Sequence, residues 1–86
     1  MIKVKRFTAT WCGPCKVLAP IFSQLEQEMT NVTFETIDVD QHKDLTAQFN
    51  VTSVPTIIIE KNGEQVYRFS GVLPKTVIAG TIQKYL

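Results

Sequence analysis

Hydrophobic and polar positions alternate along some stretches of the chain and recur every three or four residues along others. Strict alternation and β-branched runs are typical of strands, whereas the longer period is typical of one buried face of a helix. Strands are therefore predicted at about 2–8, 33–39, 56–60 and 65–69, and helices at about 12–29, 40–49 and 74–86. The resulting order, β-α-β-α-β-β-α, predicts an α/β domain.

Each predicted helix should turn a row of apolar side chains toward the core. Along the longest helix this row is Val17, Leu18, Ile21, Phe22, Leu25 and Met29. Along the last helix, which Pro74 opens, it is Val77, Ile78, Ile82 and Tyr85. In the short helix, Leu45 and Phe49 should point inward, and Asp40 is expected to cap the first turn. Pro20 lies inside the longest helix, where it removes one backbone hydrogen bond and should bend the helix axis.

The connections limit how the strands can pair. Asn62-Gly63 is a strong signal for a two-residue hairpin turn with positive φ at both residues, so the last two strands should be antiparallel. The helix between the first two strands makes that pair parallel, with a right-handed crossover. At a length of 86 residues, positions 1–86 should form a single domain.

Composition and charge exclude several classes of protein. The chain is 44% hydrophobic and 20% charged with a net charge of +1, which is typical of a globular protein and gives no reason to expect a nucleic-acid or membrane partner. The longest apolar run, at 57–59, is far too short to cross a bilayer. The first residues alternate in polarity and lack the apolar stretch of a secretion signal, so a cytoplasmic protein is expected.

Both cysteines of the chain lie in one short motif, WCGPCK at residues 11–16. The pattern places Cys12 where a strand ends and a helix begins. Unpaired N–H groups at a helix N-terminus carry partial positive charge, which favours a thiolate, and only the thiolate is a good nucleophile. Pro14 suits the first turn, where its missing N–H costs nothing. Cys15 lies one turn further on the same side and can close a disulfide with Cys12, and only Cys12 is expected to be exposed.

Redox chemistry is not the only function that two neighbouring cysteines allow. A zinc or iron–sulfur site needs about four ligands, and His42 is the one further soft ligand in the chain. A redox dithiol is therefore the favoured interpretation. The alternative is a metal-binding or structural module in which the thiols are incidental. No metal or other cofactor is expected.

Residues spread along most of the chain resemble the thioredoxin family. The matching positions are Phe7, Ala9, the motif at 11–16, Ala19-Pro20, Asp38-Val39-Asp40, Val54-Pro55-Thr56, Lys61-Asn62-Gly63 and Gly71. The resemblance implies a minimal thioredoxin-like fold, with a four-stranded mixed sheet in the spatial order 2-1-3-4 and three helices. It also implies a thiol–disulfide oxidoreductase that reduces protein disulfides through Cys12 and Cys15 and needs no cofactor beyond the disulfide between them.

The resemblance assigns further roles near the cysteines. The peptide bond between Val54 and Pro55 should be cis and lie against the disulfide, and Val54 should offer backbone hydrogen bonds to an extended substrate peptide. Trp11 should form a partly exposed apolar platform for the substrate. Gly71 should flank the substrate groove, where the lack of a side chain lets the peptide approach.

Gly13 and Pro14 lie between the cysteines and complete the expected substrate-binding residues. They resemble the form of the motif found in reductases, and so argue against the alternative in which the same fold acts as a disulfide oxidase or isomerase. The expected partners are proteins that carry disulfides, and a reductase or small thiol that regenerates the dithiol. The protein is expected to be a monomer.

Two departures from the family pattern bear on the surface and the site. By resemblance, this chain is expected to lack the strand and helix that precede the first strand in ordinary thioredoxins. One sheet face should then be thinly covered and either polar, with Lys3 and Lys5 on it, or buried in a dimer, and the alternation of these lysines with Ile2 and Val4 favours the polar outcome. Arg6 stands where the family usually has a buried aspartate. Alternation puts Arg6 beneath the long helix and Cys15, where it should pair with a carboxylate such as Asp38 or reach water. A sharper hypothesis places its guanidinium near a cysteine, where it would favour the thiolate.

Overall fold

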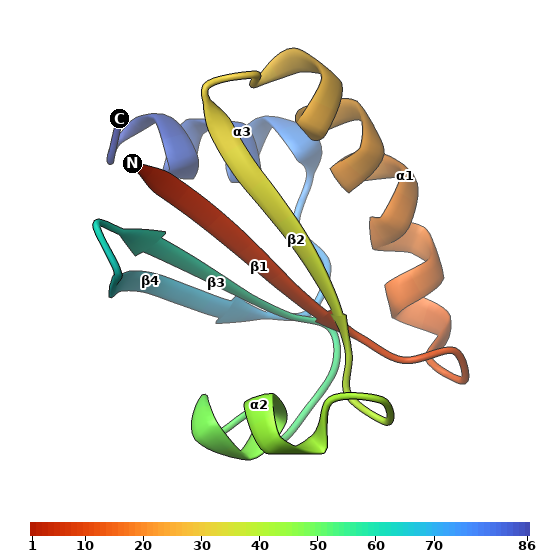
Figure 1. The fold of residues 1–86 in the computed structure, drawn as a ribbon. Coiled ribbons are helices and arrows are strands. Elements are labelled where there is room, and N and C mark those ends of the chain that lie inside the picture. The colour runs from red at the N-terminus through yellow and green to blue at the C-terminus, as the bar shows by residue number, and fades with distance from the viewer.

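Four strands form one mixed sheet in a computed structural model that describes all of residues 1–86 (Figure 1). The strands are β1 (Ile2–Thr8), β2 (Val32–Asp38), β3 (Thr56–Lys61) and β4 (Glu64–Ser70). They lie in the order β2-β1-β3-β4, in which β1 and β2 are parallel and the other two pairs are antiparallel. The predicted fold class and strand order are confirmed, and the predicted strand limits differ from these by one residue at most.

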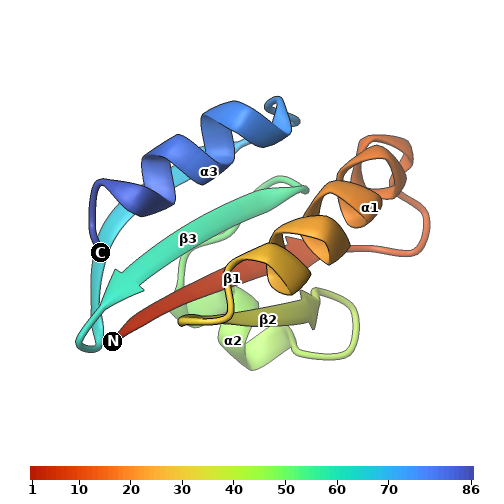
Figure 2. The same ribbon diagram turned by 90° about the horizontal axis from the view of Figure 1, so that it is seen from above.

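Three helices complete the fold: α1 (Gly13–Glu28), α2 (Lys43–Gln48) and α3 (Lys75–Gln83). Figures 1 and 2 show α1 and α3 over one face of the sheet and α2 on the opposite face. α1 continues past Pro20, and α3 ends earlier than predicted. Because α1 starts soon after β1 ends, the cysteine motif lies at one end of the sheet, at the N-terminus of α1 (Figure 1).

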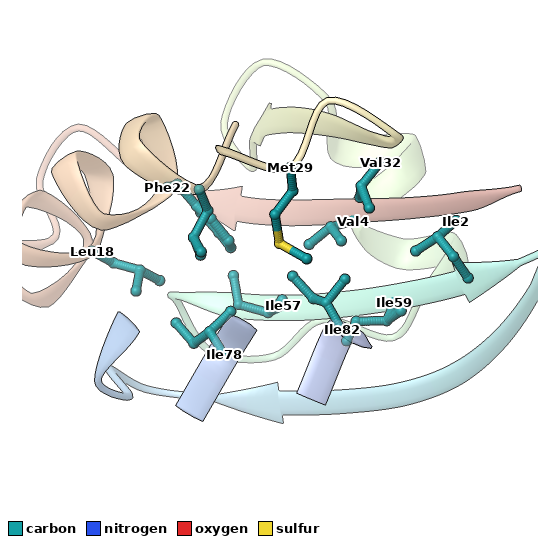
Figure 3. Close-up of a cluster of buried hydrophobic side chains, with 11 residues drawn as sticks. Ile2, Val4, Leu18, Phe22, Met29, Val32, Ile57, Ile59, Ile78 and Ile82 are labelled. Carbon is teal, nitrogen blue, oxygen red and sulfur yellow. The ribbon is translucent and has the colours of Figure 1, made fainter. Parts of the chain in front are cut away.

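The main core lies between the α1–α3 layer and the sheet (Figure 3). Its eleven buried residues are Ile2, Val4, Leu18, Phe22, Leu25, Met29, Val32, Ile57, Ile59, Ile78 and Ile82. Burial of one large aliphatic or aromatic side chain contributes roughly 1.5–3 kcal/mol. The buried row of α1 therefore fixes this helix on the sheet, and with it the position of the cysteine motif at its N-terminus.

Val17 and Val77 do not join this core, contrary to the prediction. Their side chains are 58% and 46% exposed. Each valine comes directly before the first buried residue of its helix row, Leu18 in α1 and Ile78 in α3. One residue along a helix turns the side chain by about 100°, which carries both valines off the buried face.

α2 covers a smaller core on the other face of the sheet. Phe7, Ile37 and Ile58 form this core, and Leu45 and Phe49 pack against it. The rings of Phe7 and Phe49 lie 5.8 Å apart between centroids. The predicted inward direction of Leu45 and Phe49 is confirmed.

Asp40 does not cap α2, contrary to the prediction. The helix begins later, at Lys43, with His42 at the N-cap position and no side-chain cap. The chain first makes a turn in which the carbonyl oxygen of Asp38 accepts the N–H of His42 at 2.9 Å. The turn takes up the residues before α2 and leaves the Asp40 carboxylate free for another partner.

Asn62 and Gly63 form the predicted hairpin turn between β3 and β4. Their φ angles are 54° and 86°, so both residues adopt the left-handed conformation that a two-residue hairpin of this kind needs.

Beyond α2, the second sheet face is polar, as predicted. Lys5 Nζ lies 3.0 Å from Glu60 and 4.5 Å from the centroid of the Phe49 ring. Lys3 Nζ lies 3.9 Å from Glu35 of the neighbouring strand β2. These pairs place opposite charges next to one another across the strands, where they cover the sheet without another helix.

Candidate active site

Cys12 and Cys15 form a disulfide at the N-terminus of α1, with their Cα atoms 5.3 Å apart. Cys12 is the N-cap residue of the helix, with extended backbone angles, and Gly13 and Pro14 start the first turn. The Sγ atom of Cys12 accepts the N–H of Cys15 at 3.2 Å. A negative charge that forms on this sulfur during reduction is therefore stabilised by a backbone donor and by the helix dipole.

Both cysteines are buried in this disulfide form. Cys12 is 4% exposed and Cys15 is 2% exposed, so the expectation that only Cys12 would be exposed is wrong. The two cysteines form a small apolar cluster with Ala9, and Val39 and Val54 pack against it. The two cysteines differ in their position in the helix, because Cys12 is the N-cap residue and Cys15 lies within the first turn.

The Val54–Pro55 peptide bond is cis, as the resemblance implied. Pro55 is buried, and the carbonyl oxygen of Val54 lies 3.7 Å from Cys12 Sγ. Neither the N–H nor the C=O of Val54 forms a hydrogen bond with another backbone group of the chain. Unpaired backbone groups beside a reactive sulfur are what an extended peptide needs in order to pair with this segment.

Trp11 is 68% exposed directly before Cys12. Its Nε1–H donates to the Asp40 carboxylate at 2.8 Å, which holds the indole in one orientation. The indole borders a cavity of about 160 Å³ whose lining includes Val39 and Val54. The sequence had assigned Asp40 to a helix cap, and its alternative role becomes visible only when β2 and the cysteine motif are brought together.

Gly71 lies beside the cis-proline. Its N–H donates to the carbonyl oxygen of Pro55 at 2.9 Å, and its φ is 92°. A Cβ at this position would meet no atom within 4 Å, so the positive φ is what favours glycine here.

A second cavity, of about 220 Å³, opens beside Cys15 on the α1 side of the sheet. Its lining consists of Arg6, Thr8, Ala9, Thr10, Cys15, Lys16, Ala19 and Asp38. Among these residues, Asp38 is the one carboxylate. The sequence did not identify this cavity, because its walls come from β1, β2 and the first turns of α1.

Arg6 lies beneath α1 as predicted, but it does not pair with Asp38. One guanidinium nitrogen, Nη2, donates to Thr36 Oγ1 at 3.1 Å, and Cζ lies 5.5 Å from the centroid of the Phe22 ring. The nitrogen Nε is buried without a hydrogen-bond partner. Desolvation lowers the pKa of Arg6, and the negative charge of Glu26 acts in the opposite direction. The Arg6 side chain therefore extends beneath α1 toward β2, where its guanidinium contacts Thr36 of β2 and the Phe22 ring of α1.

No three of the histidine, cysteine, aspartate and glutamate side chains are grouped in a way that would hold a metal ion. None of the helices combines the length and the apolar character that crossing a membrane requires. The chemistry that the described geometry supports is that of the disulfide itself.

A disulfide between cysteines three positions apart at a helix N-terminus, set against a cis-proline beside a four-stranded mixed sheet, defines a protein of dithiol–disulfide exchange. The Thioredoxin family model matches residues 2–84. The chain is 43% identical over 72 residues to thioredoxin of Mycoplasma genitalium, a match that covers 84% of this chain and 71% of that protein. It is 38% identical over 81 residues to thioredoxin of Bacillus subtilis, with coverage of 93% and 78%. The solved structure of Fasciola hepatica thioredoxin has a TM-score of 0.92 and 39% identity, and covers 99% of this chain and 81% of that one. The chain belongs to the thioredoxin family.

Membership and geometry together establish the reaction. The protein is a thiol–disulfide oxidoreductase that reduces disulfides with its Cys12–Cys15 pair. Two electrons pass to the substrate when the dithiol becomes the disulfide seen here.

Proposed function

We propose that Cys12 is the attacking thiol and Cys15 the resolving thiol in the reduction of protein disulfides. The Cys12 thiolate attacks one sulfur of the substrate disulfide, that bond breaks, and one substrate thiolate leaves. Cys15 then attacks Cys12 Sγ, the mixed disulfide breaks, and the second substrate thiol leaves. Support for this order comes from the position of Cys12 at the helix cap, where its sulfur already accepts a backbone N–H.

In this proposal the substrate lies as an extended peptide across the cis-proline segment. Val54 pairs with the peptide backbone through groups that form no backbone hydrogen bond within the chain. The exposed indole of Trp11 supports its apolar side chains, and Gly71 leaves room for it next to Pro55. Gly13 and Pro14 are exposed between the cysteines and complete the surface that the substrate contacts.

The proposal extends to partners and setting. The dithiol must be regenerated by a reductase or a small thiol, so the protein works in a reducing compartment such as the cytoplasm. It acts as a monomer, and no metal or organic cofactor takes part in the exchange.

The order of the two steps is tested with two single variants and one disulfide-bonded protein substrate. Cys12→Ser should abolish reduction, because no thiol remains at the helix cap. Cys15→Ser should instead accumulate a mixed disulfide, visible as an added substrate mass that dithiothreitol removes. The proposal fails if Cys15→Ser turns over at the rate of the unmodified protein, or if only Cys12→Ser traps the substrate.

A further inference from the structure

Cys15 must lose a proton from a buried position before it can attack Cys12. Its side chain is 2% exposed, and the space it faces is the cavity of about 220 Å³ between α1 and the ends of β1 and β2. Burial in general makes a thiol hold its proton more tightly than it does in water. The second step of the reaction therefore benefits from a base that this cavity can reach.

The charged side chains that face the cavity are Arg6 from β1, Lys16 from α1 and Asp38 from β2. Arginine and protonated lysine have hydrogen-bond donors only, so neither accepts a proton. Glu26 of α1 and Glu35 of β2 border a separate cavity around the Arg6 guanidinium. Asp38 is thus the carboxylate available to Cys15.

The position of the Asp38 carboxylate is fixed by its own turn. Its Oδ1 accepts the N–H of Asp40 at 2.8 Å, and no hydrogen bond involves its second oxygen. Asp38 lies opposite Thr8 in the parallel β1–β2 pair, and both residues line the cavity. Water occupies about 30 Å³ per molecule in the liquid, so a cavity of about 220 Å³ has room for a bridging water.

We propose that Asp38 accepts the proton of Cys15, through one water molecule in this cavity, as Cys15 attacks the mixed disulfide. The proton passes from Cys15 Sγ to the water and from the water to the Asp38 carboxylate. The Cys15 thiolate forms a bond with Cys12 Sγ, the bond between Cys12 and the substrate sulfur breaks, and the electron pair leaves with that sulfur. The departing thiolate then takes up one proton from solvent, and Asp38 releases the proton that came from Cys15 to solvent through the same water, so that no net proton is gained or lost in this step.

The test follows the two steps separately in rapid mixing of the reduced protein with a small aromatic disulfide. The first aromatic thiolate appears at a rate proportional to the disulfide concentration, and the second at a rate that does not depend on it. Asp38→Asn keeps the acceptor for the Asp40 N–H but removes the base. Asp44→Asn, on the exposed side of α2 and away from the cavity, removes the same charge as a control.

At pH 7 the second step of Asp38→Asn should be slower than that of the unmodified protein by on the order of 100-fold, while its first step is unchanged. The rate of its second step should then rise about tenfold per pH unit and equal the rate of the unmodified protein in alkaline solution, where the thiol ionises without a base. Asp38→Glu, which returns a carboxylate, should recover at least about tenfold of the loss at pH 7, and Asp44→Asn should change neither step.

A second step in Asp38→Asn that keeps the unmodified rate at pH 7 would overturn the proposal. So would a loss of equal size at every pH, which indicates a structural role. If Asp38→Asn does not fold, the test rests on Asp38→Glu. The assignment is contradicted if the rate of the second step of Asp38→Glu rises about tenfold per pH unit through neutral pH, as it does for a thiol without a base.

Discussion

Arg6 carries its positive charge under α1 without an ion-pair partner. Its guanidinium donates to Thr36 in a solvent-exposed hydrogen bond, which water competes for and which contributes about 0.5–1.5 kcal/mol. It also lies over the Phe22 ring, which contributes about 0.5–1 kcal/mol. Against them stands the buried Nε, which lacks a hydrogen-bond partner, at a cost of about 1–3 kcal/mol. The opposing contributions are of similar size, so the charge is tolerated at this position and adds little to stability.

Replacing Arg6 by methionine should therefore leave the free energy of unfolding unchanged or raise it by up to about 1 kcal/mol. Arg68→Met is the matched control, because the Arg68 guanidinium donates to the carbonyl oxygens of Phe49 at 2.6 Å and Asn50 at 2.9 Å. That variant should lose about 2–3 kcal/mol, as hydrogen bonds from a charged group are lost. Urea unfolding of both variants makes the comparison, and a loss in Arg6→Met as large as that in Arg68→Met would contradict it.

The pH dependence of the Arg6 variant follows from the direction of its pKa shift. Burial lowers the pKa of Arg6 below the ordinary value of an arginine, so the folded state disfavours the charged form, and stability rises with pH only between the lowered and the ordinary pKa. Below that range the arginine is protonated in both the folded and unfolded states. The stability difference between Arg6→Met and the unmodified protein should hence be constant from about pH 5 to 9, and a difference that changes through this range would rule out Arg6 as a permanently charged group.

At the scale of elements, α1 and β3 show why the fold was predictable. The buried row Leu18, Phe22 and Leu25 has helical spacing, and the β-branched run at 57–59 is buried completely. Patterns of this kind report burial directly, so element types and order follow from sequence. The burial of side chains at the edge of a helix face is not determined by this spacing, because Val17 and Val77 were included in the predicted rows and are exposed.

The candidate site divides in the same way. Cys12 at a helix start could be derived from local pattern alone, whereas the cis bond at Pro55 came from family resemblance. The direction of the Arg6 side chain depends on its bond to Thr36, and the orientation of Trp11 depends on its bond to Asp40. The two residues of each pair are 30 and 29 positions apart in the chain, respectively. No local period encodes such contacts, which is why the sequence paired Arg6 with the wrong residue.

Two glycines give a prediction about the elements. Gly71, next to Pro55, has φ 92°, whereas Gly80 lies inside α3, and a Cβ would meet no atom within 4 Å at either site. Gly71→Ala should destabilise the protein by about 1–2 kcal/mol, because the left-handed conformation is costly for alanine. Gly80→Ala should stabilise it by about 0.5–1 kcal/mol, because alanine is the better helix former. Thermal unfolding measures both, and equal changes of the same sign would show that backbone conformation does not decide these positions.

For the whole molecule, the distribution of charge on the open sheet face argues for a monomer. Lys5 and Glu60 are nearly buried as a pair, and Lys3 and Glu35 extend the alternation of charge to the edge strand β2. Because the charges on this face are already paired, a second copy of the chain would bury little apolar surface by packing on it. Charged side chains on an edge strand also discourage the addition of another strand. We expect light scattering at micromolar concentration to give the mass of one chain. A stable dimer would show that the polar face is an interface.

The reduction potential of the Cys12–Cys15 pair tests the central claim most directly. Equilibration with glutathione buffers of known ratio, followed by acid quenching and mass measurement of alkylated cysteines, gives the fraction of dithiol. If the protein is a reductase, the reduction potential of the pair should lie below about −200 mV. The reference value for thioredoxins is about −270 mV. A value near about −120 mV, typical of a strong disulfide oxidant, would contradict the assignment of this protein as a disulfide reductase.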